Sequence, residues 1–180
     1  IEGWSDEDGN MDIFEYNGKF LSYFAYWDGL NFTKKSLDKF TVKFALELSA
    51  REKEVIRAAR KSSYIIALTE NGAESTRRHE FSHAFSFTDK VYKTKVFEIV
   101  ESIPQELRDK FVSGLDGMGY SVGDHDYENE EIHAYLVGYD QKEYESFFPL
   151  ILQEEVTNYV SAIGKIYSEK ESNIIINTTI

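Results

Sequence analysis

The pattern of hydrophobic and polar residues predicts strands in the first half of the chain. Residues 40–48 alternate between apolar and more polar positions, and this period of two is typical of a half-buried strand, although the segment could also begin a helix. The aromatic-rich segment 20–27 also predicts a strand, with residues 14–16 as its hairpin partner across an Asn-Gly turn. A further strand is predicted at residues 64–69, which contain several β-branched side chains. Together these segments predict a small sheet.

Helical periodicity dominates the rest of the chain. One helix is predicted from Ser49, which forms a capping box with Glu52, to about residue 61, and another begins near residue 75. Residues 1–10 and 171–180 lack a clear period and are expected to be loosely ordered. The pattern predicts an α+β protein with a small N-terminal β-sheet and a mostly helical C-terminal half. The remaining helices are predicted at residues 90–102, 105–115, 128–139 and 142–170, the last interrupted near Pro149.

Length and composition indicate one globular domain. A chain of 180 residues that is 42% hydrophobic can bury a core, and we expect a single domain over residues 1–180. The formal net charge of −12 disfavours nucleic acid and anionic membranes as partners, because both attract basic surfaces. No segment approaches the run of about 18 apolar residues that predicts a membrane span. The oligomeric state is not indicated.

The absence of cysteine limits the possible metal chemistry. Disulfides and thiolate ligands are excluded, so a zinc ion would have to be held by His and carboxylate side chains. The chain begins at Ile1 with neither an initiator methionine nor a signal-like segment. We therefore expect a soluble protein and leave two compartments open, the cytoplasm or the exterior after removal of a leader.

The segment from His79 to His83, His-Glu-Phe-Ser-His, carries the strongest candidate chemistry. Its histidines are four residues apart, so on a helix both imidazoles point the same way and can bind one Zn²⁺ ion. Glu80 would lie beside the metal and act as the general base that takes a proton from an activated water. Ordinary structural histidines are the alternative interpretation. A metal site is favoured over structural histidines because all four histidines of the chain fall between positions 79 and 133.

A third ligand is expected from the helix predicted at 128–139. Glu131 shares a helix face with Ala134 and Gly138, and such small residues let another helix approach closely. Glu131 is therefore the favoured third ligand. The neighbouring Glu130 is the alternative on helical geometry alone.

The two motifs resemble those of zincin metallopeptidases of the gluzincin type, especially small uncharacterised bacterial or phage-like members. The resemblance rests on the HExxHA pattern from residue 79 and the Glu-Ile-x-Ala-Tyr-Leu pattern from residue 131. It implies a zincin-like fold, with a strand-helix-helix scaffold over about residues 64–139, that binds one Zn²⁺ and hydrolyses peptide bonds. It also implies that Glu80 is the general base and that the zinc ligands are His79, His83 and Glu131.

Two other metal placements compete with this assignment. Asp89 follows His83 by six residues, as in a metzincin-like arrangement with Met118 in its methionine turn, but Ser86 stands where that pattern needs glycine. The acids between positions 124 and 130 suggest a calcium loop, but Asn129 occupies the position that an EF-hand reserves for glycine. This acidic segment is interpreted as a loop and the start of a helix.

The resemblance also suggests a polypeptide substrate if the strand at 64–69 is an edge strand, whereas a strand buried between neighbours would favour a small amide or no substrate. In zincin-like folds an edge strand pairs with an extended substrate, and the strand at 64–69 directly precedes the site helix. His125 and Tyr127 are candidates for stabilising an oxyanion, whereas His133 is expected to face away from Glu131. Two other functions stay open: a catalytically inactive zincin-like module that binds metal or regulates a partner, and a toxin or effector-like protease with one protein target.

Overall fold

The computed structural model shows an α+β protein in two compact units, residues 1–73 and 74–180. The α+β class confirms the prediction from the hydrophobic pattern, whereas a single domain over residues 1–180 stays a prediction. Residues 171–180 are expected to be loosely ordered, and of these, residues 173–180 lie outside the described part of the chain. The structure describes residues 2–5, 11–16, 19–20, 29–46, 48, 50–68 and 72–172.

A three-stranded antiparallel sheet begins the first unit. Strand β2 (Met11–Tyr16) lies between β1 (Glu2–Ser5) and β3 (Lys19–Phe20). The pairing of β2 with β3 confirms the predicted hairpin, while the rest of the strand predicted at 20–27 lies outside the described residues. Within residues 1–10, which are expected to be loosely ordered, residues 2–5 form β1 and pair with β2 through the backbone. The rest of this segment lies outside the described residues.

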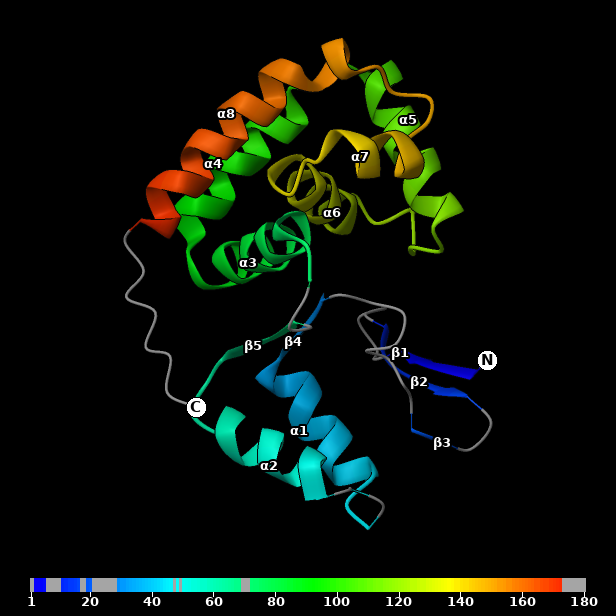
Figure 1. The fold of residues 1–180 in the computed structure, drawn as a ribbon, viewed down its shortest axis with the longest axis vertical. Helices are drawn as coiled ribbons and strands as arrows, with labels where there is room; N and C mark the ends of the chain where they lie inside the picture. Colours follow the sequence, from blue (N-terminus) through cyan, green and yellow to red (C-terminus); the bar gives the residue numbers. More distant parts are fainter. Residues whose placement is uncertain are drawn as a thin grey trace. The chain divides into compact units, whose positions relative to one another are not determined.

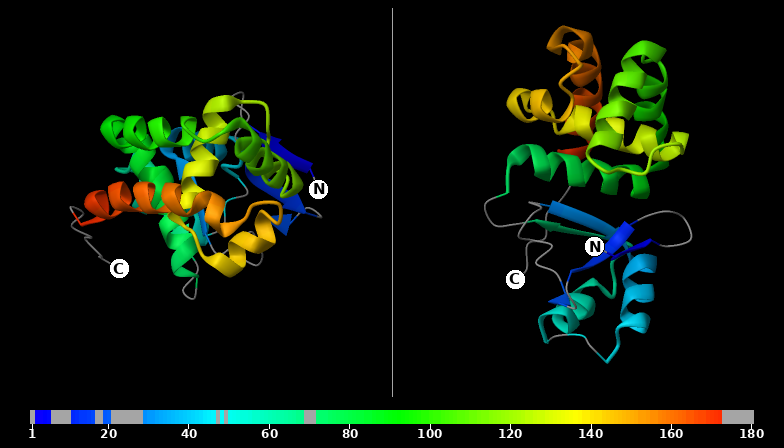
Figure 2. Two further views of the ribbon diagram at one scale, coloured as in Figure 1. Left: turned by 90° about the horizontal axis from the view of Figure 1, so that it is seen from above. Right: turned by 90° about the vertical axis from the view of Figure 1, so that its right-hand side faces the viewer.

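A second, two-stranded sheet pairs segments that are distant in the sequence. Strand β4 (Gly29–Thr33) runs antiparallel to β5 (Tyr64–Leu68), and Figure 2 shows the two strands alongside each other. Strand β5 confirms the prediction at 64–69. Between the two strands lie helix α1 (Lys34–Lys43) and helix α2 (Ala50–Ala59), and α2 confirms the helix predicted at 49–61. Ser49, the predicted cap of that helix, lies outside the described residues.

The predicted strand at 40–48 is wrong, because residues 34–43 form α1 and a turn follows. Thr33 caps this helix by accepting a hydrogen bond from the backbone N–H of Ser36. The alternating pattern is misleading: Val42 is 81% exposed and Leu46 is 99% exposed, so neither belongs to a buried strand face. The buried face follows a helical spacing instead. Leu37, Phe40 and Phe44 pack into one hydrophobic cluster with residues of β5 and α2.

The second unit is entirely helical in its described part. Its helices agree with the predicted segments to within a few residues, and the break near Pro149 separates the last two (Figure 1). They are α3 (Glu74–Thr88), α4 (Lys90–Glu101), α5 (Gln105–Gly117), α6 (His125–Val137), α7 (Gln141–Phe147) and α8 (Gln153–Glu171).

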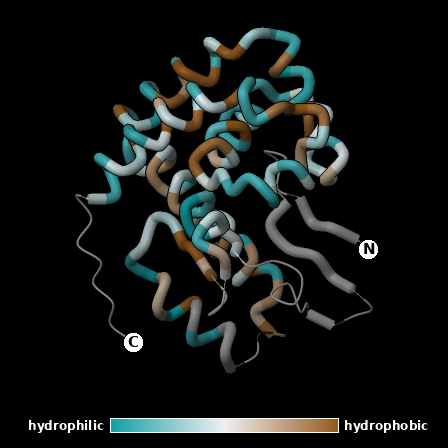
Figure 3. Tube along the Cα trace, turned by 45° about the horizontal axis from the view of Figure 1, so that its top comes forward, coloured by the Kyte–Doolittle hydropathy of each residue, from teal (hydrophilic) through white to brown (hydrophobic). Residues whose placement is uncertain are grey.

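Helix α6 lies at the centre of this unit, packed against α3, α4 and α8. Hydrophobic and hydrophilic residues alternate around these helices (Figure 3), and the apolar faces meet in one core. No helix in the described ranges is both long and apolar enough to cross a bilayer. The largest fully buried side chains are Phe111, Leu115, Ile132, His133, Leu136, Phe148, Ile163 and Tyr167.

Helices α3 and α6 approach each other closely where Gly138 follows α6. A Cβ atom at Gly138 would lie 2.7 Å from the carbonyl oxygen of Ser75 and 3.1 Å from the Cβ of His79. Ala134, one turn earlier, is completely buried. This confirms the expectation that small residues on this face allow the two helices to come together.

We predict that Gly138→Ala destabilises the protein by about 1–3 kcal/mol, because the new methyl group must separate α6 from the backbone of α3. Denaturant unfolding measures the change. Gly117→Ala is the matched control, since a Cβ at this helical position meets nothing within 4 Å and should change stability by less than about 1 kcal/mol. Equal stability of the two variants would contradict the close approach.

Candidate metal site

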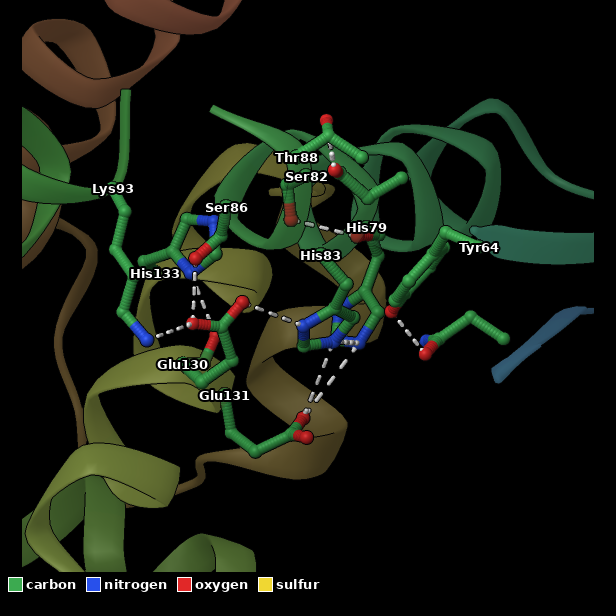
Figure 4. Close-up of polar contacts among 12 residues, drawn as sticks. Tyr64, His79, Ser82, His83, Ser86, Thr88, Lys93, Glu130, Glu131 and His133 are labelled. Carbon is green, nitrogen blue, oxygen red and sulfur yellow. Dashed lines mark hydrogen bonds and ion pairs between the residues drawn. The ribbon is translucent and has the colours of Figure 1, made fainter. Parts of the chain in front are cut away.

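Helix α3 presents His79 and His83 on one face. One turn of helix separates the two residues, and their Nε2 atoms are 3.1 Å apart (Figure 4). His83 is buried, whereas the side chain of His79 is 15% exposed. The two imidazoles therefore converge on one point at the edge of the helical core, as the four-residue spacing predicts.

Glu131 of helix α6 faces this pair of nitrogens. Its Oε2 atom lies 3.8 Å from Nε2 of His79 and 3.7 Å from Nε2 of His83, as Figure 4 shows. This oxygen is buried and has no hydrogen-bond partner among the described residues. A buried carboxylate oxygen without a partner is costly in a folded protein, and a cation among these three atoms would relieve that cost.

One potential ligand atom from each of these three residues lies within 4.8 Å of the other two. This spacing suits three side chains around one ion, so His79, His83 and Glu131 form a buried group that can hold a metal ion. Within the described residues they are the group with metal-binding geometry.

Glu130 lies on the other side of the His83 ring. Its Oε1 atom is 3.4 Å from Nδ1 of His83, and its Oε2 atom accepts a hydrogen bond of 2.7 Å from Ser86 Oγ. The two nitrogens of an imidazole point in different directions, so a carboxylate at Nδ1 does not share an ion with Nε2. Between the two candidates that helical geometry left open, the structure therefore favours Glu131 as the ligand.

Glu80 is buried beside the potential ligands. Its carboxylate is close enough to raise the pKa values of both His83 and Glu131 through Coulombic interaction. It does not belong to the group with metal-binding geometry. These are the properties expected of a residue that acts next to a bound metal rather than on it.

Burial and nearby carboxylates together shift the pKa values of the potential ligands. Burial by itself would lower the pKa of His83, but the carboxylates of Glu131, Glu130 and Glu80 raise it to about 9. Burial raises the pKa of Glu131 to about 7, against the opposing effect of His83. Burial and the nearby His83 keep the pKa of His79 well below its usual value. Near neutral pH the site thus holds a proton on His83, where a metal ion would bind.

Asp89, the metzincin-like alternative, has a different role. Its carboxylate caps α4 by accepting hydrogen bonds from the N–H groups of Val91 and Tyr92, and it pairs with Lys170 at 2.6 Å. Asp89 is therefore not brought into the metal-binding group. Ser86, which stands where that alternative needs glycine, is buried and contributes a hydroxyl to Glu130 instead.

The acidic segment before α6 forms a loop and a helix start, as expected. Asp124 caps α6 by accepting hydrogen bonds from the N–H groups of Asp126 and Tyr127. Glu128 instead accepts from the N–H of Gly123 and pairs with the buried Arg108 at 3.1 Å. Through these contacts, Asp124 and Glu128 organise the start of the helix that carries Glu131.

The other two histidines are not part of the metal-binding group, although the ring of His133 lies 6.0 Å from that of His83. His125 is exposed, and its Nδ1 accepts from the amide of Asn129, 3.3 Å away. His133 is completely buried and donates from Nδ1 to the backbone carbonyl of Glu130 at 2.7 Å. Burial lowers the pKa of His133 to about 4, so its ring is neutral. The oxyanion roles considered for His125 and Tyr127 stay predictions.

A tyrosine cluster next to the site was not expected from the sequence. The ring of Tyr135 lies 4.7 Å from the ring of His79, and its hydroxyl is 2.9 Å from that of Tyr120. The Tyr135 hydroxyl also donates to Met118 Sδ at 3.5 Å. The four-residue spacing from Glu131 to Tyr135 places both on one face of α6 and could have indicated this contact.

We predict that Glu131→Ala and His83→Ala each lose stoichiometric binding of added Zn²⁺, because each removes one of three converging donors. The loss should exceed the roughly 100-fold upper range for residues that only support a ligand. Equilibrium dialysis with metal analysis gives the stoichiometry. The exposed His125 provides the matched control, and His125→Ala should bind Zn²⁺ as the unmodified protein does.

We also predict that Zn²⁺ affinity increases with pH between about pH 6 and pH 9. His83, with its pKa raised to about 9, and Glu131, with its pKa raised to about 7, must lose their protons before both can bind the ion. At pH 7, binding should therefore release about one to two protons. Calorimetry in buffers of different ionisation enthalpy measures this release, and an affinity independent of pH would contradict the assigned ligands.

Comparisons of the chain with protein-family models, with curated proteins and with solved structures gave no match.

Proposed function

We propose that the protein is a zinc-dependent metallopeptidase with a zincin-like fold. The observation that carries the proposal is the convergence of His79, His83 and Glu131 around one point, with the buried Glu80 beside them. Two imidazoles and one carboxylate make a three-ligand set that catalytic zinc sites use, leaving a fourth position for water or substrate.

The donor set suits some metals better than others. Calcium and magnesium prefer sites built from oxygen ligands, which disfavours both for a group with two imidazole nitrogens. Fe²⁺ also binds two histidines and one carboxylate. Zinc and hydrolysis are favoured over iron chemistry because Glu80 supplies a carboxylate base next to the ligands, and hydrolysis requires such a base.

In the proposed reaction, Glu80 moves the protons. Bound zinc would supply a Lewis acid that lowers the pKa of a water molecule toward about 7. Glu80 accepts the proton of the attacking water and later donates it to the leaving amine. Its burial next to Glu131 and His83 keeps it at the site for both transfers.

The proposed substrate class is a polypeptide. Strand β5 pairs with β4. The expectation that β5 receives an extended peptide through its backbone stays a prediction.

We predict that Glu80→Gln lowers the rate of peptide cleavage by about 10²–10⁴-fold while Zn²⁺ binding and thermal stability are retained. The amide has the shape of the carboxylate but cannot accept the proton. Casein and a library of quenched fluorescent peptides serve as substrates. Glu74→Gln is the matched control, because Glu74 is an exposed acid on the same helix and pairs with Arg77.

The experiment also separates the competing functions. A protein that binds Zn²⁺ stoichiometrically but cleaves none of the peptides would support an inactive zincin-like module. Cleavage of very few peptides, or of a single protein and no peptide, would favour a protease with one protein target. Full cleavage by Glu80→Gln would contradict the proposed mechanism.

A further inference from the structure

Glu130 joins the potential ligand His83 to two helices. It belongs to α6, and its carboxylate contacts His83 and Ser86 of α3 and Lys93 of α4 (Figure 4). The Ser86 hydroxyl is 2.7 Å from Oε2, while Nζ of the half-exposed Lys93 is 3.8 Å from the same oxygen. The carboxylate is therefore held in place from two sides.

The contact with His83 determines which ring nitrogen can bind a metal. An ionised carboxylate only accepts hydrogen bonds, so Nδ1 of His83 must carry the hydrogen that it donates to Glu130. In a neutral imidazole the other nitrogen then has a free lone pair. That nitrogen is Nε2, the atom that faces His79 and Glu131.

The hydroxyl of Ser86 binds the oxygen of Glu130 that does not contact His83. Ser86 is buried one turn of helix after His83, so its Oγ fixes Oε2 while Oε1 stays with the ring. Helix α3 thus supplies both the ligand and the group that anchors its supporting carboxylate.

We propose that Glu130, anchored by Ser86, is the positioning residue of the metal site: it holds the His83 ring in the orientation and hydrogen placement that direct Nε2 to the metal. The proposal rests on the metal centre described above and adds a role for two residues that do not bind the metal. Supporting partners of this kind typically change metal affinity by about 10–100-fold when they are removed.

The test compares three variants with the unmodified protein. Glu130→Ala should weaken Zn²⁺ binding by about 10–100-fold, because the ring loses its acceptor. Glu130→Gln keeps one acceptor oxygen for Nδ1 of His83, and its amide group can donate to the Ser86 hydroxyl, so this variant should recover most of the lost affinity. Ser86→Ala should lie between them. Asp126→Asn is the matched control, since it removes one exposed carboxylate from the same helix and should leave the affinity unchanged.

A second readout separates positioning from a purely structural role. The visible absorption of the Co²⁺-substituted protein reports ligand geometry, and it should change in Glu130→Ala and return in Glu130→Gln. Unmodified affinity and an unmodified Co²⁺ spectrum in Glu130→Ala would overturn the proposal. If Glu130→Ala does not fold, Ser86→Ala decides, and unchanged Zn²⁺ affinity in that variant would overturn the proposal equally.

The result can be told apart from failure of the proposed function. If the unmodified protein binds neither Zn²⁺ nor Co²⁺, the metal centre itself is wrong and the positioning role falls with it. If the unmodified protein binds Zn²⁺ and His83→Ala does not, the centre is established, and the Glu130 series then tests the positioning role alone. Peptide cleavage is not needed for either conclusion.

Discussion

The close packing of α3 against α6 brings a buried carboxylate opposite two imidazoles, and the candidate chemistry depends on this contact. Gly138 and the buried Ala134 leave room for the two backbones to approach. With larger side chains on that face, Glu131 would be held away from His79 and His83, and the three ligand atoms would no longer converge. The same approach leaves Oε2 of Glu131 buried without a hydrogen-bond partner among the described residues. A buried oxygen without a partner costs free energy. A cation bound at this site would remove that cost in addition to forming its own bonds to the ligands.

Carboxylates lie on two sides of the His83 ring. Glu131 faces Nε2, and Glu130 faces Nδ1, so each ring nitrogen has a carboxylate of its own. The two acids are neighbours in the sequence but differ in environment. Burial raises the pKa of Glu131 to about 7. For Glu130, burial is outweighed by hydrogen bonds from His83 and Ser86 and by nearby charge, which hold its pKa at about 2. One acid is thus ready to exchange a proton for a metal ion, while the other remains ionised in its position.

Basic residues are outnumbered by acidic ones, 20 against 32, and several of them pair with the helices that carry the site. The buried Arg108 of α5 pairs with Glu128 and donates to Asn129 at 2.7 Å, and both acceptors lie within three residues of Glu131. At the other end of the unit, Lys170 of α8 pairs with the cap of α4, and Arg77 of α3 pairs with Glu171 at 2.7 Å. Partly exposed pairs contribute little stability each, so their main effect is to fix the register of the helices. The buried pair at Arg108 would cost more to break, because its loss would leave a charge without a partner.

The sequence by itself determined the helices of the second unit, the spacing of His79 and His83, and the exclusion of thiolate ligands, because these depend on periodicity and residue type within single segments. It misplaced residues 40–48, where an alternating pattern and a helical one overlap and only burial of Leu37 and Phe40 distinguishes them. It also left Glu130 and Glu131 as alternatives. Their separation required tertiary structure, because adjacent residues on a helix point about 100° apart and the position of α3 decides which one meets the imidazoles. The role of Ser86 and the contact of Tyr135 with His79 were likewise decided by packing between helices, which no local pattern encodes.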